Sequence, residues 1–287
     1  MEQKSAVSVL GLGLLGASFC MELEGKYRRI GWCRNPETRK KALDSGVIDQ
    51  IAESPEEAFA AGDITVLCLP IPVIMEYIRK YGSCLRKGGV LTDIGSVKGV
   101  IEHAALEVEG LHFIGSHPMA GTEKSGFDNA FKGLYANADV FIVPPPGAEK
   151  TDIEKIEKMW QDIGTRTTVL DSGSHDVLVA GTSHVPHILA SATTLSVLDV
   201  PESERIIRFS GCATGFRDSS RVASSSPSMW REIVEENTPA VLEAVTALRK
   251  HLDEFEEMIR NGDFDGFEKK FSKGKALRDQ WLRWKKY

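Results

Sequence analysis

Three glycines spaced as G-x-G-x-x-G near the amino terminus constrain the fold of this 287-residue chain more than any other feature. They follow the apolar run 7–10 and lead into residues 17–23, whose composition is typical of a helix. In such a unit Gly11 permits the tight turn, Gly13 lets a ligand approach the backbone, and Gly16 lets the helix pack close to the strand. Free N–H groups at the helix start favour phosphate groups. The pattern predicts a dinucleotide-binding turn made by Gly11, Leu12, Gly13, Leu14, Leu15 and Gly16.

The end of the second strand pattern, residues 28–35, should carry the group that reads the ribose. An acidic residue there accepts hydrogen bonds from the 2′-hydroxyl of NAD, but this chain has Cys33 and Arg34, with a basic stretch at 39–41. A guanidinium can pair with the 2′-phosphate of NADP, so we predict NADP, with NAD as the alternative. The alternative is that Arg34 is an ordinary solvated residue at the end of the strand and binds no cofactor. The remaining cofactor-binding residues are predicted to be Arg34, Asn35, Leu69 and Pro70.

Strand and helix patterns alternate along roughly the first 170 residues. Short apolar runs alternate with helical patterns such as 71–81 and 97–107, and these runs lie at 64–70, 89–94, 112–114, 139–143 and 167–170. Apolar strands between helices indicate a parallel sheet covered on both faces. After about residue 172 only helical patterns remain, at 175–194, 239–261 and 264–287. The predicted fold class is α/β: an N-terminal Rossmann-type doubly wound sheet, residues 1–170, and an all-helical C-terminal domain, residues 171–287.

The helical pattern 239–261 carries one apolar stripe, which could form an internal core or a subunit interface. Its members are Val241, Leu242, Val245, Leu248, Leu252, Phe255 and Ile259. The basic stretch that follows carries Trp281 and Trp284 at helical spacing. This favours a solvated helix with two packed tryptophans over a nucleic-acid patch.

Composition narrows the function classes. The net charge of −6 argues against nucleic acid and anionic membrane surfaces as partners. We expect no membrane span, and residues 1–4 do not have the pattern of a signal peptide. The five cysteines are scattered without a C-x-x-C pair, which favours reduced core residues of a cytoplasmic protein.

A histidine between small and turn-forming residues lies in the segment 115–126, GSHPMAGTEKSG. We expect the preceding strand to end at Ile114 and a loop carrying His117 to open over the sheet edge, where open α/β folds place their chemistry. Histidine is the side chain best suited to proton transfer near neutral pH. His117 is therefore the candidate proton acceptor, with an ordinary loop histidine as the alternative.

Two segments of the helical half could contact a substrate. Segment 181–187 places His184 and His187 three residues apart on one helix face. No third metal ligand stands out, so substrate contact is preferred, with buried structural histidines as the alternative. Segment 215–221 carries Arg217, Asp218 and Arg221, suited to binding a carboxylate. A local pair with Asp218 is the alternative, more so for Arg217 than for Arg221.

Taken together, the motifs resemble the prephenate/arogenate dehydrogenase family of tyrosine biosynthesis. They occur in family order over nearly the whole chain: the glycine-rich turn and residues 93–98, 115–126, 183–187, 215–221 and 226–233. The resemblance implies a nucleotide-binding domain followed by a helical domain that forms a homodimer, with the substrate between the domains. It implies oxidative decarboxylation of prephenate to 4-hydroxyphenylpyruvate with reduction of NAD(P). Oxidation of arogenate to tyrosine, linked to NADP, is the alternative.

The resemblance also implies residue roles. His117 would accept a hydrogen bond or proton from the substrate hydroxyl, with Ser96 as a second partner, and these two are the catalytic candidates. Arg221 would hold a substrate carboxylate, and no metal is expected. The other substrate-binding candidates would line or gate the pocket: His187, His184, Ser183, Thr122, Glu123 and Asp218.

Two other classes share the expected fold. Dehydrogenases of the β-hydroxyacid type depend on a catalytic lysine on the interdomain helix, where this chain has the segment 183–187. A non-catalytic nucleotide sensor needs neither a proton acceptor nor a carboxylate clamp. The presence of His117, His187 and Arg221 together therefore argues against a sensor.

Overall fold

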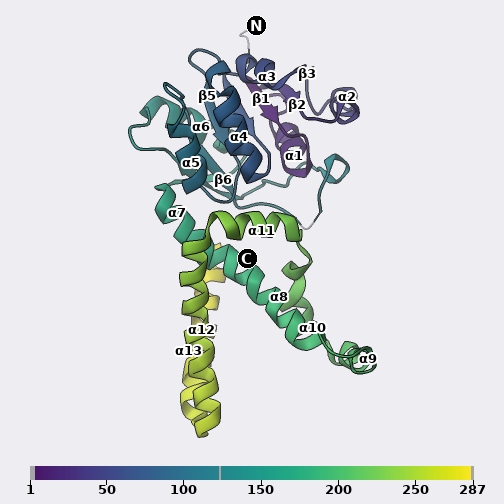
Figure 1. Ribbon diagram of the computed structural model, residues 1–287, viewed down its shortest axis with the longest axis vertical. Coiled ribbons are helices and arrows are strands. Elements are labelled where there is room, and N and C mark those ends of the chain that lie inside the picture. Colours follow the sequence, from purple (N-terminus) through teal and green to yellow (C-terminus); the bar gives the residue numbers. More distant parts are fainter. Residues whose placement is uncertain (1–3, 123, 286–287) are drawn as a thin grey trace. The chain divides into compact units, whose positions relative to one another are not determined.

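The computed structural model describes residues 4–122 and 124–285. These residues form two compact units, divided between Thr238 and Pro239. The first unit begins with a parallel sheet of order β3-β2-β1-β4-β5 (Figure 1). Its strands are β1 (Ala6–Leu10), β2 (Arg28–Trp32), β3 (Gln50–Ile51), β4 (Ile64–Leu67) and β5 (Val90–Asp93). This strand order, reversing beside β1, confirms the doubly wound sheet.

Helices cover both faces of this sheet. Side chains alternate along each strand, so each strand presents apolar residues to both faces. Val7 and Val9 of β1 belong to a buried cluster with α1, α2 and α6, whereas Ala6 and Leu10 belong to a cluster with α3, α4 and α5. The helices are α1 (Leu14–Glu22), α2 (Pro36–Asp44), α3 (Pro55–Ala61), α4 (Ile71–Tyr81), α5 (Gly99–Leu106) and α6 (Lys150–Asp162), with 3₁₀ turns η1 (Gly82–Cys84) and η2 (Phe127–Asn129). Both faces of the sheet are thus buried, as expected for a parallel sheet.

A second sheet of three strands corrects the expectation for the segment around His117. Its order is β6 (Gly115–Pro118), β7 (Asp139–Val143) and β8 (Arg166–Val169), with β6 antiparallel to β7. The predicted strand at 112–114 makes only a single bridge, from Phe113 to β5. His117 is therefore a strand residue, paired with Phe141, and the prediction of a loop was wrong. The backbone of 115–118 continues extended because β7 supplies its hydrogen-bond partners.

The rest of the first unit is helical. It consists of α7 (Ser172–Val179), the π-helical segment η3 (Ala180–His184), α8 (Val185–Leu198), α9 (Glu202–Gly211), α10 (Thr214–Ser220), the 3₁₀ turn η4 (Arg221–Ser224) and α11 (Pro227–Glu236). The helix expected over 175–194 is thus interrupted by the π segment. Trp230 and Ile233 of α11 join the buried cluster around α4, which packs α11 against that helix.

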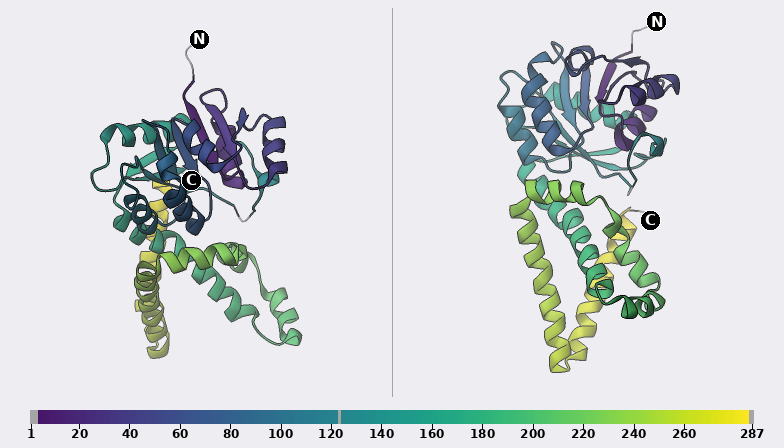
Figure 2. Two further views of the ribbon diagram at one scale, coloured as in Figure 1. Left: turned by 45° about the horizontal axis from the view of Figure 1, so that its top comes forward. Right: turned by 45° about the vertical axis from the view of Figure 1, so that its right-hand side comes forward.

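The second unit is a pair of helices, α12 (Thr238–Asn261) and α13 (Phe264–Lys285), with α13 returning in the opposite direction (Figure 2). Phe255 and Phe267 hold them together, with ring centroids 5.3 Å apart. Several apolar side chains of the α12 stripe remain exposed on the single chain, so an internal core is wrong for Leu242 (61 %), Leu252 (52 %) and Ile259 (58 %). Trp281 (47 %) and Trp284 (70 %) of α13 are also exposed, where packed tryptophans were expected. Among the described residues, no helix has the length and apolar character needed to span a membrane.

Candidate active site

The glycine-rich turn leaves open space in front of the first residues of α1. Gly11 has a φ of 102°, and a Cβ there would lie 2.1 Å from the carbonyl oxygen of Cys68. A Cβ at Gly16 would lie 1.9 Å from the carbonyl oxygen of Gly11, so the helix packs directly on the turn. Gly13, by contrast, is exposed and has no atom within 4 Å of an added Cβ. The open backbone at the helix start fits a bound pyrophosphate.

The other predicted cofactor residues lie at the same edge of the sheet, after β2 and β4. Arg34 is exposed, and the Cys33 thiol beside it is half-buried. The Asn35 side chain caps α2, accepting the amide of Glu37 at 2.8 Å. Leu69 and Pro70 follow β4 and lead into α4, while the side chains of Leu12 and Leu14 are buried in the core. Leu12 and Leu14 therefore have only backbone groups to offer a ligand.

A buried ion pair fixes the edge of the sheet beyond β5. The Lys98 ammonium donates to the Asp93 carboxylate, with both side chains at most 1 % exposed. Lys98 also donates to the carbonyl oxygen of Ser116 at 2.9 Å, and Asp93 accepts the Ser116 amide at 3.3 Å. Ser96 lies half-buried in the loop between Asp93 and Lys98. The ion pair thus joins the loop that carries Ser96 to the strand that carries His117.

His117 is the first member of a buried chain of three side chains. Its Nδ1 lies 2.9 Å from Nε2 of His175, which is fully buried at the start of α7. Nδ1 of His175 lies 2.7 Å from a carboxylate oxygen of Asp176. The Asp176 carboxylate also accepts the amides of Lys98 and Gly99, each at 2.8 Å. Sequence reasoning missed His175, Asp176, Lys98 and Asp93 as site residues; the adjacent His-Asp pair at a helix start was the available signal.

The electrostatics of this chain favour neutral imidazoles beside a charged carboxylate. Burial holds the pKa of His117 well below 6.5, and the neighbouring His175, Lys98 and His184 lower it further. Burial also lowers the pKa of His175, against the opposing hydrogen bond to Asp176. Burial raises the pKa of Asp176, but hydrogen bonds from His175 and the two amides lower it below its ordinary value. At neutral pH His117 is therefore an unprotonated base.

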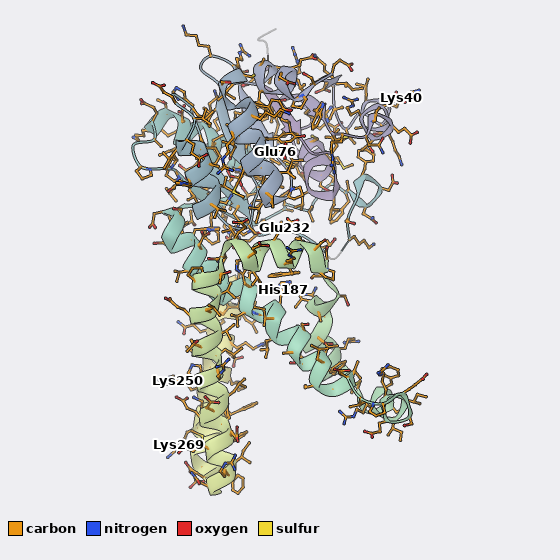
Figure 3. The ribbon with its side chains drawn as sticks, in the orientation of Figure 1. Lys40, Glu76, His187, Glu232, Lys250 and Lys269 are labelled. Carbon is orange, nitrogen blue, oxygen red and sulfur yellow. The ribbon has the colours of Figure 1, made fainter. Side chains whose placement is uncertain are left out.

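The helical segments place His184 and His187 around one tryptophan, Trp230 of α11. His187 is half-buried on α8, beside α11 (Figure 3), and its ring stacks on Trp230 with centroids 3.9 Å apart. Nδ1 of His187 donates to the Ser183 carbonyl oxygen at 2.9 Å. His184 is 1 % exposed, and Asn237 donates to its Nδ1 at 3.3 Å. This leaves Nε2 of His184 as a buried donor with no partner among the described residues, and Nε1 of Trp230 is another.

Burial lowers the pKa of His187, against the opposing hydrogen bond to the Ser183 carbonyl oxygen. The positive charge of Arg221 lowers this pKa further, so Arg221 lies near the His187 ring. Its own side chain is exposed. The carboxylate of Asp218 pairs with Arg217 at 3.2 Å, the alternative foreseen for Arg217. Thr122 is exposed in its loop and accepts the amide of Lys124, while Glu123 lies outside the described residues. Across residues 4–122 and 124–285, no cluster of three ligand-type side chains could hold a metal ion.

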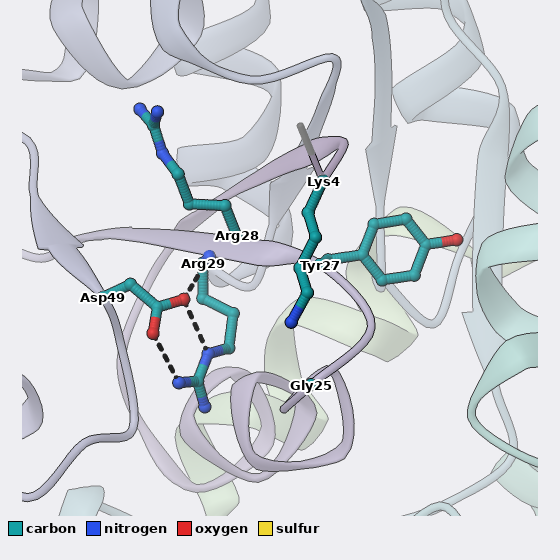
Figure 4. Close-up of a pocket in the computed structure, with 6 residues that line it drawn as sticks. All are labelled: Lys4, Gly25, Tyr27, Arg28, Arg29 and Asp49. Carbon is teal, nitrogen blue, oxygen red and sulfur yellow. Dashed lines mark hydrogen bonds and ion pairs between the residues drawn. The ribbon is translucent and has the colours of Figure 1, made fainter. Parts of the chain in front are cut away.

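A surface pocket at the other end of β2 is separate from these residues. Arg29, Asp49 and Lys4 are among its lining residues (Figure 4). Arg29 makes a bidentate pair with Asp49 at 2.6 and 3.0 Å, so its guanidinium is occupied. The pocket lies at the amino ends of the strands, whereas ligands of open α/β sheets bind at the carboxyl ends.

The parallel sheet and its open glycine-rich turn define a Rossmann-type dinucleotide-binding protein. Comparison with known families makes the assignment specific. Residues 23–169 match the family model of the prephenate dehydrogenase nucleotide-binding domain, and residues 171–273 match that of the prephenate dehydrogenase dimerization domain. The chain belongs to the prephenate dehydrogenase family, and it is an oxidoreductase that uses a nicotinamide cofactor.

Individual relatives match over nearly the whole chain. A prephenate dehydrogenase of Lactococcus lactis is 30 % identical over 279 residues, covering 95 % of this chain and 76 % of the relative. A prephenate dehydrogenase of Aquifex aeolicus, solved with hydroxyphenyl propionate and NAD+, superposes with a TM-score of 0.88 at 29 % identity, over 98 % of this chain and 99 % of that one. An arogenate dehydrogenase of Synechocystis gives a TM-score of 0.85 at 27 % identity, over 96 % and 99 %.

Proposed function

We propose that this protein converts prephenate to 4-hydroxyphenylpyruvate and CO₂ while reducing NAD(P), a step of tyrosine biosynthesis. The observation that carries the proposal is the buried, neutral His117 on β6, a strand tied through Lys98 and Asp93 to the end of β5 in the sheet that holds the glycine-rich turn. The similarity to prephenate dehydrogenases supports it. Arogenate is the second candidate substrate, favoured by the likeness to an arogenate dehydrogenase structure and by Cys33 and Arg34 in place of an acidic residue.

The chemistry requires a group that handles the hydroxyl proton of the substrate. A nicotinamide held at the glycine-rich turn would accept a hydride from the ring carbon that bears the hydroxyl. As that hydride leaves, the hydroxyl becomes strongly acidic, and His117 accepts its hydrogen bond or proton through Nε2. Loss of the ring carboxylate as CO₂ returns an electron pair to the ring, which becomes aromatic. The phenol oxygen then regains the proton, so the reaction releases no net proton.

The remaining residues position the substrate. Ser96, in the loop held by Asp93 and Lys98, is the second hydrogen-bond partner of the hydroxyl. Arg221 pairs with a substrate carboxylate, because burying that charge without a cation is costly. The buried donor of His184 and the stacked ring of His187 support their role as pocket walls. We assign substrate contact or gating also to Ser183, Thr122, Glu123 and Asp218, on the family motif alone.

For the cofactor we propose NADP over NAD. Arg34 follows β2 and is exposed. The residue before it is Cys33, so no acidic side chain stands there to repel a 2′-phosphate. A guanidinium there can pair with the 2′-phosphate. The backbone of residues 11–16 is proposed to hold the pyrophosphate, with Asn35, Leu69 and Pro70 beside it.

We infer that the protein acts as a homodimer in the cytoplasm. The match to a dimerization domain and the exposed apolar side chains of α12 and α13 support the dimer. The five free cysteines agree with a reducing compartment. We divide the chain into a nucleotide-binding domain, residues 1–170, and a helical substrate and dimerisation domain, residues 171–287.

One assay tests the function. The purified protein is incubated with prephenate or arogenate and with NADP or NAD, while the absorbance of the reduced nicotinamide is followed. We expect the highest kcat/KM with prephenate and NADP. A higher kcat/KM with arogenate would select the second candidate, and no reduction in any of the four mixtures would refute both.

A further inference from the structure

The hydrogen bonds behind His117 fix where its protons are. An ionised carboxylate only accepts hydrogen bonds, so the proton between Asp176 and His175 belongs to Nδ1 of His175. Nε2 of His175 is then a lone pair, and the proton shared at 2.9 Å with His117 belongs to Nδ1 of His117. The lone pair of His117 is left on Nε2. The carboxylate of Asp176 thus selects, through one intervening ring, the tautomer that a base requires.

We propose that His175 and Asp176 form a proton relay behind His117: they hold its Nδ1 proton at rest and receive that proton when Nε2 takes one from the substrate. Both are positioning residues, since they act through His117. The inference deepens the proposed function and rests on it for the identity of the substrate.

The charges around the three side chains favour moving the Nδ1 proton of His117 to Nε2 of His175. His117 is buried and faces Lys98 and the two rings of His175 and His184, so a positive charge on it is poorly placed. His175 also faces Lys98, but its Nδ1 contacts Asp176, with Asp93 as a further nearby carboxylate. Phe141 of β7 covers the His175 ring, with centroids 5.7 Å apart. A cation on His175 is therefore less destabilised than a cation on His117, because only His175 has carboxylates that oppose the effect of burial.

Each proton transfer of the relay breaks one bond to hydrogen and forms another. The O–H bond of the substrate breaks and an N–H bond forms at Nε2 of His117. The Nδ1–H bond of His117 breaks and an N–H bond forms at Nε2 of His175, which becomes an imidazolium beside Asp176. After CO₂ leaves, both transfers run backwards and the phenol oxygen recovers its proton. No oxidant or reductant beyond the nicotinamide is needed.

A first experiment tests the resting arrangement without any substrate. The full-length protein is labelled with ¹⁵N-histidine, and the nitrogen shifts of His117 are assigned by their loss in a His117→Gln variant. We expect the proton of His117 on Nδ1. A proton on Nε2 would overturn the relay. Because no turnover is needed, this result is independent of whether prephenate is the substrate.

A second experiment measures the relay in the reaction. Asp176→Asn removes the charge and should lower kcat about 100-fold, within the range of acid–base contributions, with cofactor affinity unchanged. Removing the carboxylate also lowers the pKa of the two rings, so the acidic limb of the kcat/KM profile should move to lower pH. A purely structural role would lower kcat and leave that limb in place, and this outcome would contradict the relay.

His175→Gln separates the two proposed roles of His175, which are to accept the Nδ1–H hydrogen bond of His117 at rest and to take up that proton during the reaction. The glutamine amide can donate to Asp176 and accept from His117, so the tautomer should survive in the nitrogen spectrum while kcat falls at least about tenfold. His103→Gln is the matched control, because His103 is an exposed histidine that pairs with the nearby Glu107; its kcat should equal that of the unmodified protein. If Asp176→Asn and His175→Gln both keep kcat within about threefold, the relay is wrong.

Discussion

The imidazole of His187 and the indole of Trp230 lie nearly parallel, 3.9 Å apart with an angle of 28° between their planes. The stack joins α8 to α11, two helices separated by about thirty residues of helical chain and turns. Arg221, whose charge acts on His187, lies between them in the sequence. Three segments that the sequence presents separately are thus parts of one surface.

His117 should be the proton acceptor. His117→Asn removes the Nε2 lone pair and should lower kcat by at least about 100-fold, as expected for loss of general-base assistance. The measurement is steady-state kinetics with each substrate, with cofactor affinity determined by fluorescence titration as the control. Nearly intact turnover would show that another group accepts the proton.

The exposed Arg34 should set the cofactor preference. We expect a lower KM for NADP than for NAD, and Arg34→Ala should abolish most of this difference because it removes the partner of the 2′-phosphate. Lys40→Ala is the matched control, since Lys40 is also exposed and basic but lies further along, in α2. Equal or better use of NAD by the unmodified protein would contradict this prediction.

Arg221 should bind the substrate and not the cofactor. Arg221→Gln should raise the substrate KM about tenfold or more, equivalent to about 1.4 kcal/mol for a lost charge-assisted contact. Arg260→Gln serves as the control, because Arg260 is an exposed arginine of α12 that pairs with Glu256 one turn away. Weaker cofactor binding with an unchanged substrate KM would place Arg221 in the other half of the site.

The buried ion pair should be essential for stability. Lys98→Met leaves the Asp93 carboxylate buried without its cation and should cost about 3–5 kcal/mol in the free energy of unfolding. Lys132→Met breaks the exposed pair with Glu24 and should cost no more than about 1 kcal/mol. Urea denaturation of both variants gives the comparison; equal losses would mean that burial does not decide the value of these pairs.

Stability should fall with pH below neutrality. His117, His175 and His184 have folded-state pKa values below 6.5, about 4 for His184. The unfolded chain therefore binds more protons, so their contribution is complete above about pH 6.5 and is lost as the pH falls towards 4. Unfolding in urea across this range measures the loss, which should be smaller in His184→Gln. An identical pH dependence in that variant would contradict the assignment to His184.

Local chemistry explains what could be predicted from the sequence. The glycine-rich turn was predictable because its spacing is local: Gly16 packs on the carbonyl oxygen of Gly11 in the same turn. Strands β4 and β5 were predictable from their apolar composition between helices. The helix caps at Asn35 and Asp171 follow the same local logic.

Contacts between distant segments explain what could not be predicted. The strand 115–118 contains glycine and proline, which have low strand propensity, and it is extended because β7 pairs with it. The contact between His117 and His175 joins residues 58 positions apart. Its existence depends on where α7 packs against the second sheet, and no periodicity in the sequence encodes that placement.

The tight packing of the glycine-rich turn also limits which positions at this edge of the sheet can be substituted. A side chain at position 11 or 16 would collide with backbone within about 2 Å, so these two positions admit only glycine. Arg34 is exposed and holds no part of the core. If Arg34 sets the coenzyme preference, as proposed, selection or engineering can change that preference at the exposed rim of the sheet without altering the packed glycines of the turn.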